Sequence, residues 1–280
     1  MPPRQIPAAG ETFLDHVGLF LRDLEAAGEK LEELGFRVSP VNVQMARGEG
    51  GRLAPVGTSN RNVILPFGFI ELLSPTSASE LSTRMETAIE RYEGTHLIAF
   101  SQADLGETER RLTADGWQME SLVKLRRDEP ALAWDVLRCT PAQMPEGRIQ
   151  FALCLTPEAV WNPAAISRPH GVEALSSVLL AVEDPDEAVA RFARYVGKPS
   201  PPDRAGDLTT LELDRGRLCF VKAEVARSAG IAVADVPQIL GIGLTTENPE
   251  HRTRVTLGPP LNTVLAIDTP GTDPWSHLVS

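Results

Sequence analysis

The stretch Leu14-Asp15-His16-Val17-Gly18-Leu19 returns about eighty residues later as Gly94-Thr95-His96-Leu97-Ile98-Ala99, with a histidine at the same place in both copies. Each copy is an apolar run of strand length. A helical pattern follows each run and stops at a glycine and an aromatic residue, Gly35-Phe36 in the first copy and Gly116-Trp117 in the second. Internal periodicity of this kind indicates repeated structural units. The repeat predicts two copies of a small unit, each opening with a histidine-bearing strand.

Two further copies lack the histidine. The third begins at Ser177-Val178-Leu179-Leu180-Ala181-Val182, and the fourth runs from Leu240 to Ile267 with too few residues for a full helix. Strand-like runs follow the helical patterns of the first two units, so each of these has the order βαβββ. The chain predicts an α+β fold of repeated βαβββ units paired into curved, barrel-like mixed sheets. We expect a mobile tail (1–12), an N-terminal paired domain with a metal site (13–156), a connector (157–173) and a degenerate second βαβββ domain (174–280).

The first helical pattern has recognisable ends. Leu24, Ala27 and Leu31 recur at helical spacing, Asp23 is a candidate N-cap, and Gly35 is a candidate terminating residue. One face of this helix is expected to pack on a sheet. The glycine-rich stretch at 47–52 is either a lid over the site or a surface loop.

The charge and composition of the chain exclude several classes of binding partner. The chain has 280 residues and a formal net charge of −11, so its field repels phosphate backbones and anionic lipid. No apolar run approaches the roughly 18 residues of a membrane-spanning helix, and the first residues lack the apolar stretch of a signal peptide. Three widely spaced cysteines indicate free thiols rather than a disulfide framework. These features predict a cytoplasmic protein that binds neither nucleic acid nor membrane.

A carboxylate interrupts an otherwise apolar strand in the first unit. Glu71 lies within Phe69-Ile70-Glu71-Leu72-Leu73, where a buried charge is costly unless it is paired or bound to a metal. Gln150 holds the matching position of the second unit. If the two units pair about a pseudo-two-fold axis, His16, Glu71 and His96 form a 2-His-1-carboxylate metal site, which leaves positions open for substrate. Gln150 is then either a weak fourth ligand or a satisfied buried amide.

Four further residues are candidates for substrate binding. Asn60 and Arg61 could border the pocket and bind an anionic group, since a guanidinium holds a carboxylate through two contacts. The alternative for Arg61 is a solvated loop. Trp161 and His170 lie on the connector, where they either cap the pocket or serve packing.

At these positions the chain resembles the vicinal oxygen chelate superfamily, which includes glyoxalase I, bleomycin-resistance proteins and extradiol dioxygenases. It resembles the glyoxalase-like domain proteins more narrowly. The resemblance implies a cavity that holds a divalent metal (Fe, Mn, Ni, Co or Zn), which chelates two adjacent oxygens of a small-molecule substrate. It places the metal ligands at His16, Glu71, His96 and Gln150. The matching segments are Leu14-Asp15-His16-Val17, Leu34-Gly35-Phe36, Gly57-Thr58-Ser59-Asn60-Arg61, Phe69-Ile70-Glu71-Leu72-Leu73 and Leu155-Thr156-Pro157-Glu158 with Trp161.

Two classes of function follow. The first is a metal-dependent lyase, isomerase or dioxygenase, with no catalytic residue assigned. Glyoxalase I has a carboxylate where this chain has Gln150, and an amide cannot abstract a proton, so the base role would fall to a metal-bound water. The alternative is a non-catalytic protein of the resistance type that binds and sequesters a small molecule. The second domain either closes the cavity or forms the face of a homodimer.

Overall fold

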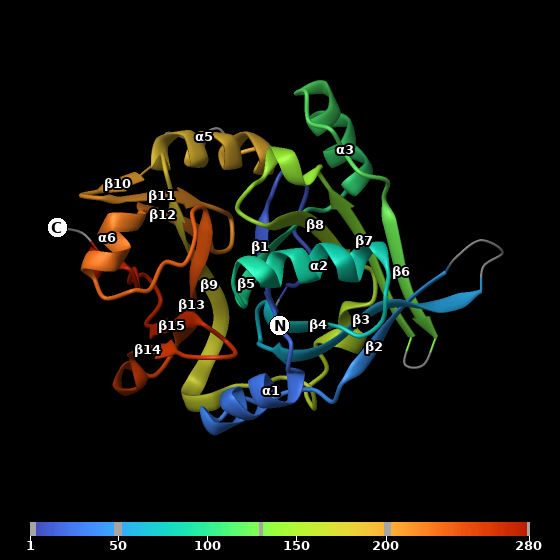
Figure 1. The fold of residues 1–280 in the computed structure, drawn as a ribbon, viewed down its shortest axis with the longest axis horizontal. Helices are drawn as coiled ribbons and strands as arrows, with labels where there is room; N and C mark the ends of the chain where they lie inside the picture. Colours follow the sequence, from blue (N-terminus) through green and yellow to red (C-terminus); the bar gives the residue numbers. More distant parts are fainter. Residues whose placement is uncertain (1–3, 48–51, 129–130, 199–202, 279–280) are drawn as a thin grey trace.

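Two mixed β-sheets form the framework of the fold (Figure 1). The structure is a computed structural model, and it describes residues 4–47, 52–128, 131–198 and 203–278. Eight strands from the first half of the chain close into a barrel, and seven strands from the second half form an open sheet. This arrangement confirms the α+β class with repeated units paired into curved, barrel-like sheets. Residues 48–51 of the candidate lid lie outside the described part of the chain.

The barrel has the strand order β1-β4-β3-β2-β6-β7-β8-β5, and β5 returns to pair with β1. Each half of it follows the predicted βαβββ order, with one additional helix, α2, joining the halves. The elements are β1 (Phe13–Phe20), α1 (Leu24–Glu33), β2 (Asn42–Arg47), β3 (Leu53–Ile64), β4 (Phe69–Pro75), α2 (Glu80–Arg91), β5 (Gly94–Ser101), α3 (Leu105–Ala114), β6 (Val123–Asp128), β7 (Ala131–Arg138) and β8 (Arg148–Cys154).

The two histidine-bearing strands lie side by side at the centre of this arrangement. β1 pairs antiparallel with β5, β1 pairs parallel with β4, and β5 pairs parallel with β8. The β1–β5 ladder shifts register twice, between Leu14 and His16 and between Gly18 and Leu19. At the second shift His96 has no pairing partner on β1, because Gly18 pairs with Leu97 and Leu19 pairs with Thr95.

Helix α1 has the predicted ends. The Asp23 side chain accepts hydrogen bonds from the backbone N–H groups of Glu25 and Ala26, so it is the N-cap. Gly35 follows the helix with φ +86°, a left-handed conformation that glycine adopts without steric cost. The predicted apolar stripe of Leu24, Ala27 and Leu31 is buried.

The second sheet has the order β10-β11-β12-β9-β13-β15-β14. The third unit keeps its helix, α5, whereas the fourth replaces it with the short 3-10 turn η4, which accounts for its reduced length. Between β7 and β8 of the barrel lies the short turn η2 (Pro141–Gln143). The elements that follow the barrel are α4 (Pro157–Val160), η3 (Pro169–Gly171), β9 (Val172–Val182), α5 (Pro185–Val196), β10 (Asp203–Ala205), β11 (Leu208–Glu212), β12 (Arg217–Lys222), α6 (Ala223–Ser228), β13 (Gln238–Thr246), η4 (Pro249–His251), β14 (Thr253–Leu257), β15 (Thr263–Asp268) and η5 (Ser276–Leu278).

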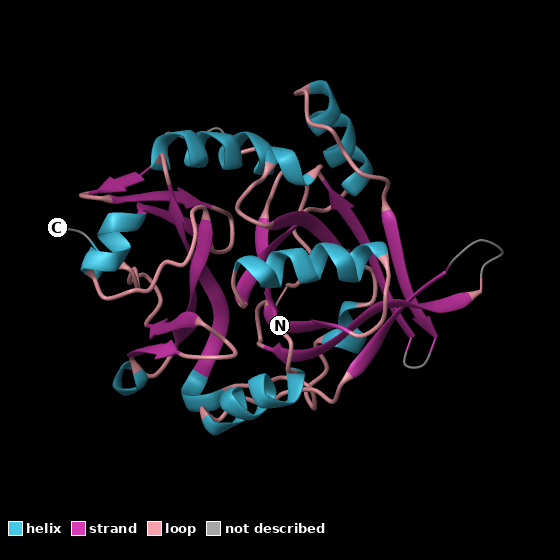
Figure 2. Ribbon diagram, viewed as in Figure 1, coloured by secondary structure: helices cyan, strands magenta, loops and turns pink. Residues whose placement is uncertain are grey.

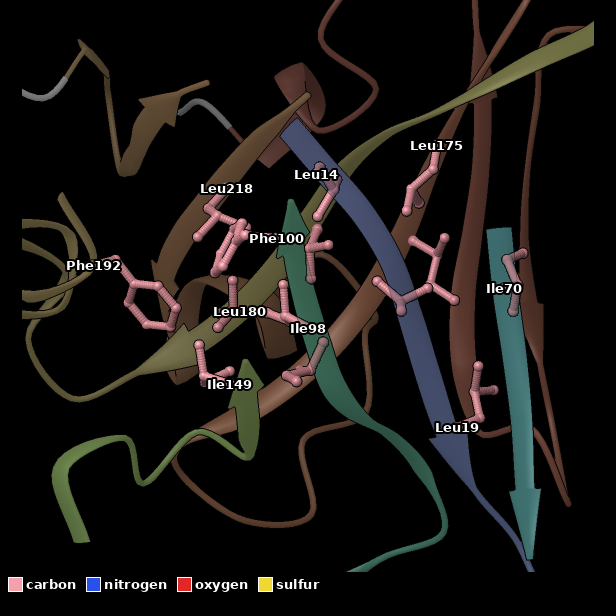
Figure 3. Close-up of a cluster of buried hydrophobic side chains, with 14 of the residues drawn as sticks. Leu14, Leu19, Ile70, Ile98, Phe100, Ile149, Leu175, Leu180, Phe192 and Leu218 are labelled. Atoms are coloured by element: carbon pink, nitrogen blue, oxygen red, sulfur yellow. The ribbon is translucent and has the colours of Figure 1, made fainter. Parts of the chain in front are cut away.

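A single apolar core joins the outer face of the barrel to the second sheet. Leu14 of β1 and Phe100 of β5 belong to the same buried cluster as Leu180 of β9 and Leu218 of β12 (Figure 3). Close packing of this kind excludes water from that face of β1 and β5. Side chains alternate along a strand, so the opposite face of the same strands is left to build the interior of the barrel.

Helix α2 lies across the barrel (Figure 2) and covers one end of it. Its Met85 and Ile89 are buried against Phe20 of β1 and Leu73 of β4. Within the segment expected to form a mobile tail, Gln5 is buried and its amide donates to the Pro66 carbonyl at 2.7 Å. The predicted domain boundaries stay predictions, because the two sheets share a core.

Candidate functional site

The interior of the barrel combines apolar and polar side chains from six strands. Residues directly opposite each other in a ladder point to the same face of the sheet. Phe20, Leu73, Leu97, Ala99, Val136 and Ala152 form an apolar cluster on that inner face. Alternation along the same strands places a polar set on the inner face as well. That set comprises His16 on β1, Asn60 and Asn62 on β3, Glu71 on β4, Arg138 on β7, and Arg148 and Gln150 on β8.

His16 is fixed by its sequence neighbour. Its Nδ1 lies 2.6 Å from Oδ1 of Asp15, and both side chains are buried. An ionised carboxylate can only accept, so Nδ1 donates this hydrogen bond, and a neutral ring in this orientation keeps the lone pair on Nε2. Nε2 lies 3.9 Å from Oε2 of Glu71. The imidazole also stacks on Phe69, with ring centroids 4.3 Å apart. This arrangement presents an oriented, basic nitrogen beside Glu71.

Glu71 is held by amides rather than by a cation. Its Oε1 accepts from Nδ2 of Asn60 at 2.6 Å and from Nε2 of Gln44 at 3.2 Å. Gln44 is fixed in turn, because its Oε1 accepts from the Thr58 hydroxyl at 2.6 Å. These bonds offset part of the cost of burying the carboxylate. They leave Oε2 facing His16.

His96 lies near the end of the barrel that α2 covers. Its Nε2 donates to the backbone carbonyl of Tyr92 at 2.7 Å. The ring is stacked between Tyr92 and Phe20, at centroid separations of 3.9 and 5.3 Å. Burial lowers the pKa of His96 to about 4, so the imidazole is neutral at physiological pH. Its partners indicate a packed, hydrogen-bonded side chain.

The four predicted metal ligands are only partly brought together. His16 and Glu71 face each other, whereas Oε1 of Gln150 accepts from Nε of Arg138 at 2.9 Å and Nε2 of His96 is engaged by Tyr92. Within the described residues, no group of three or more His, Cys, Asp or Glu side chains is placed to hold a metal ion. The ligand set as predicted does not fit this arrangement. Metal binding by these residues stays a prediction.

Two of the predicted substrate-binding residues lie in or against the barrel interior and two do not. Asn60 is on the inner face, bonded to Glu71. Trp161 is buried against Phe69 and Trp134, with ring centroids 6.2 Å from each. Arg61 instead points to α1, where it binds Glu25 and Glu32 at 3.0 Å each.

His170 also lies away from the interior. Its ring contacts the ring of His251, at 4.5 Å between centroids. Its backbone carbonyl accepts from the Thr246 hydroxyl at 2.8 Å. The prediction of a substrate contact for Arg61 or His170 therefore gains no support from their positions.

The sequence analysis missed several residues of this site, among them Asp15, Asn62, Arg138 and Arg148. Arg138 pairs with Gln150 across the β7–β8 ladder, and Arg148 precedes Gln150 by two positions on β8. The two-residue period of a strand was the signal that could have found both arginines, because Gln150 was already assigned to the inner face. Asp15 adjoins His16, and a carboxylate beside a functional histidine is a recurring orienting partner.

Several solved structures are similar to this chain. The solved structure of a hypothetical protein from Staphylococcus aureus superposes with a TM-score of 0.69 at 11% identity, covering 92% of this chain and 99% of that one. A mutant of 4-hydroxymandelate synthase from Streptomyces coelicolor gives a TM-score of 0.54 at 13% identity, covering 85% of this chain and 72% of that one. Methylmalonyl-CoA epimerase from Mycobacterium tuberculosis gives a TM-score of 0.41 at 20% identity, covering 53% of this chain and 91% of that one. At 11% and 13% identity, the likeness to the first two structures concerns the fold alone.

The paired βαβββ barrel is that of the vicinal oxygen chelate superfamily, as the sequence resemblance implied. A family profile described as "Glyoxalase-like domain" matches residues 14–196. The chain belongs to this glyoxalase-like domain family. A comparison with curated proteins found no match.

Among the described residues, no helix is both long enough and apolar enough to cross a bilayer.

Proposed function

We propose that this protein is an enzyme that moves a proton in a small, oxygen-bearing substrate held inside the barrel, with His16 as the base. The observation that carries the proposal is the Asp15–His16 hydrogen bond, which directs a basic Nε2 toward the interior beside Glu71. A histidine oriented by a carboxylate is well suited to accept a proton near neutral pH. Proton transfer of this kind is the chemistry of an isomerase or a lyase.

The chemical step takes a proton from a carbon next to a substrate carbonyl. The proton moves to Nε2 of His16, the electron pair of the broken C–H bond forms a carbon–carbon double bond, and the carbonyl π pair moves onto the oxygen, which gives an enolate. Asp15 stabilises the imidazolium that forms, because its carboxylate accepts from Nδ1–H. Return of the proton to another position or face of the enolate completes an isomerisation.

Two buried polar atoms support a ligand at this place. Oδ1 of Asn62 and Nε1 of Trp161 have no hydrogen-bond partner among the described residues. Asn62 pairs with Glu71 in the β3–β4 ladder, and Trp161 packs on Phe69, which stacks on His16. A buried polar atom without a partner costs about 1–3 kcal/mol, which a substrate oxygen or hydroxyl would offset. The Trp161 N–H is also a donor available to a developing oxyanion.

No step of this reaction passes through a metal, because the predicted ligand set does not fit the geometry around His96. A cytoplasmic location and a homodimer likewise stay predictions. The sequestering alternative is favoured by one observation: His96, one of the three ligands on which the metal-enzyme hypothesis depended, is engaged by Tyr92. A sequestering protein binds its ligand without proton exchange.

The test is solvent deuterium exchange. The wild-type protein is incubated in D₂O with a panel of 2-oxo acids and 2-hydroxy ketones, and deuterium at the carbon next to the carbonyl is followed by NMR. We expect exchange that His16→Gln slows by roughly 100-fold or more, the range of general-base catalysis. His170→Gln is the matched control and should leave the rate unchanged. Exchange that is equally fast in the His16→Gln variant would refute the proposal, and tight binding without exchange would favour sequestration.

A further inference from the structure

Two arginine side chains enter the barrel from neighbouring strands. Arg138 lies opposite Gln150 on β8, and Arg148 lies opposite Leu97 on β5. Leu97 belongs to the inner apolar cluster, so Arg148 starts from the inner face. Leu97 is itself opposite Gly18, and Gly18 is opposite Glu71, so Arg148 and Glu71 share one row of residues around the barrel.

Among the described residues, these guanidinium groups lack the carboxylate partners that Arg61 and Arg191 have. Arg138 donates to the neutral amide of Gln150, and Arg148 lies over the Phe20 ring, 4.7 Å from its centroid. In the described part of the chain, no carboxylate comes within ion-pair distance of either one. The nearby Glu120 is bound to Arg84 at 2.7 Å. Arg61, by contrast, holds two carboxylates on the outer face.

Burial without a counter-charge has a physical consequence. It lowers the pKa of Arg138, and it lowers the pKa of Arg148 to about 9, with the charge of Arg138 as the next cause. The charges of Glu71 and Glu120 act on both groups in the opposite direction without cancelling the effect of burial. Two such cations close together are unfavourable unless an anion joins them.

We infer that Arg138 and Arg148 form an oxyanion subsite that holds the carboxylate or phosphate group of the substrate inside the barrel. A guanidinium binds these groups through paired, charge-assisted hydrogen bonds. The Phe20 ring supports Arg148 from one side. The inference deepens the proposed function, on which it rests for the reacting part of the substrate: His16 acts on a carbon while the arginines hold an acid group. The substrate class is thereby a small oxyacid or its phosphate ester.

The test is binding of simple anions to the full chain by isothermal titration calorimetry. The probes are pyruvate, inorganic phosphate and methyl pyruvate, the last being a neutral ester. We expect pyruvate or phosphate to bind and the ester not to bind, with the stronger anion identifying carboxylate or phosphate as the group recognised. Arg138→Gln and Arg148→Gln should each weaken binding roughly tenfold or more. Arg217→Gln, on β12 of the second sheet, is the matched control.

A stability measurement separates binding from folding. Arg148→Gln removes a charge without a partner, so the variant should be at least as stable to heat as the wild type while losing anion affinity. Arg148→Lys, which keeps a charge, should retain part of the affinity. The inference is overturned if the wild type binds neither anion, or if both glutamine variants bind as the wild type does.

The outcomes also distinguish this inference from the proposed function. Anion binding that depends on both arginines, with no proton exchange on any substrate, would keep the subsite and remove His16 as a catalytic base. Exchange that needs His16, with KM unchanged in Arg148→Gln, would keep the function and remove the subsite.

Discussion

The imidazole of His96 occupies a buried place that disfavours its charged form. Only 1% of the residue is exposed, and its ring nitrogen donates to Tyr92 while the ring stacks on two aromatic side chains. His16 has the equivalent place in the repeat but has a carboxylate partner and faces Glu71. Position in a repeat therefore does not determine the chemical role of a residue.

His96 makes stability depend on pH. Its pKa is about 4 in the folded protein against 6.5 for the ordinary side chain, so the unfolded chain binds the proton more readily. Its contribution is fully present above about pH 6.5 and is lost as the pH falls toward 4, at about 1.4 kcal/mol per pH unit. Urea unfolding between pH 7 and pH 4.5 should show a steeper loss for the wild type than for His96→Gln. Parallel curves for the two proteins would contradict this assignment.

At the scale of elements, the turn between β3 and β4 ties the Glu71 strand to the His16 strand. Gly68 in this turn has φ +78°, and a Cβ added there would lie 2.8 Å from the backbone oxygen of Asp15. Glycine is needed both for the left-handed backbone and for the close approach. The turn thereby helps to position the Asp15–His16 pair.

Gly68→Ala is predicted to affect stability and exchange together. An L-residue in this conformation costs roughly 1–2 kcal/mol, and the new methyl group would displace Asp15. We expect a lower free energy of unfolding and slower deuterium exchange. Gly230→Ala is the control, because Gly230 has φ +79° but nothing within 4 Å of an added Cβ. That variant should lose similar stability and keep the exchange rate; equal exchange rates in both variants would show that the turn does not position the dyad.

Strand alternation also explains which site residues the sequence could predict. Asn60 and Arg61 are adjacent on β3, so they cannot both face inward, and the structure sends Arg61 to α1. The same rule would have assigned Arg138 and Arg148 to the interior. The environment of His96 could not be foreseen, because the register shift that passes over it and the cover by Tyr92 depend on tertiary packing.

At the scale of the whole molecule, the repeat was sufficient to predict the architecture. Units of recurring length predicted the barrel and the abridged fourth unit, since the hydrophobic pattern of each strand and helix is local. The shared core between the barrel and the second sheet was not predicted. It depends on which outer faces meet, and a single sequence does not contain that information. This core holds β1 and β5 from outside, so their inner faces are free to carry polar groups.

The central claim is that His16 presents an unprotonated Nε2 to the interior of the barrel, and the protonation of its two ring nitrogens tests it most directly. Long-range ¹H–¹⁵N NMR of the full chain reports this for each neutral histidine, with His16→Gln used to assign the signal. The account predicts the hydrogen on Nδ1 in the wild type and a loss of that preference in Asp15→Asn. A hydrogen on Nε2 in the wild type would contradict it.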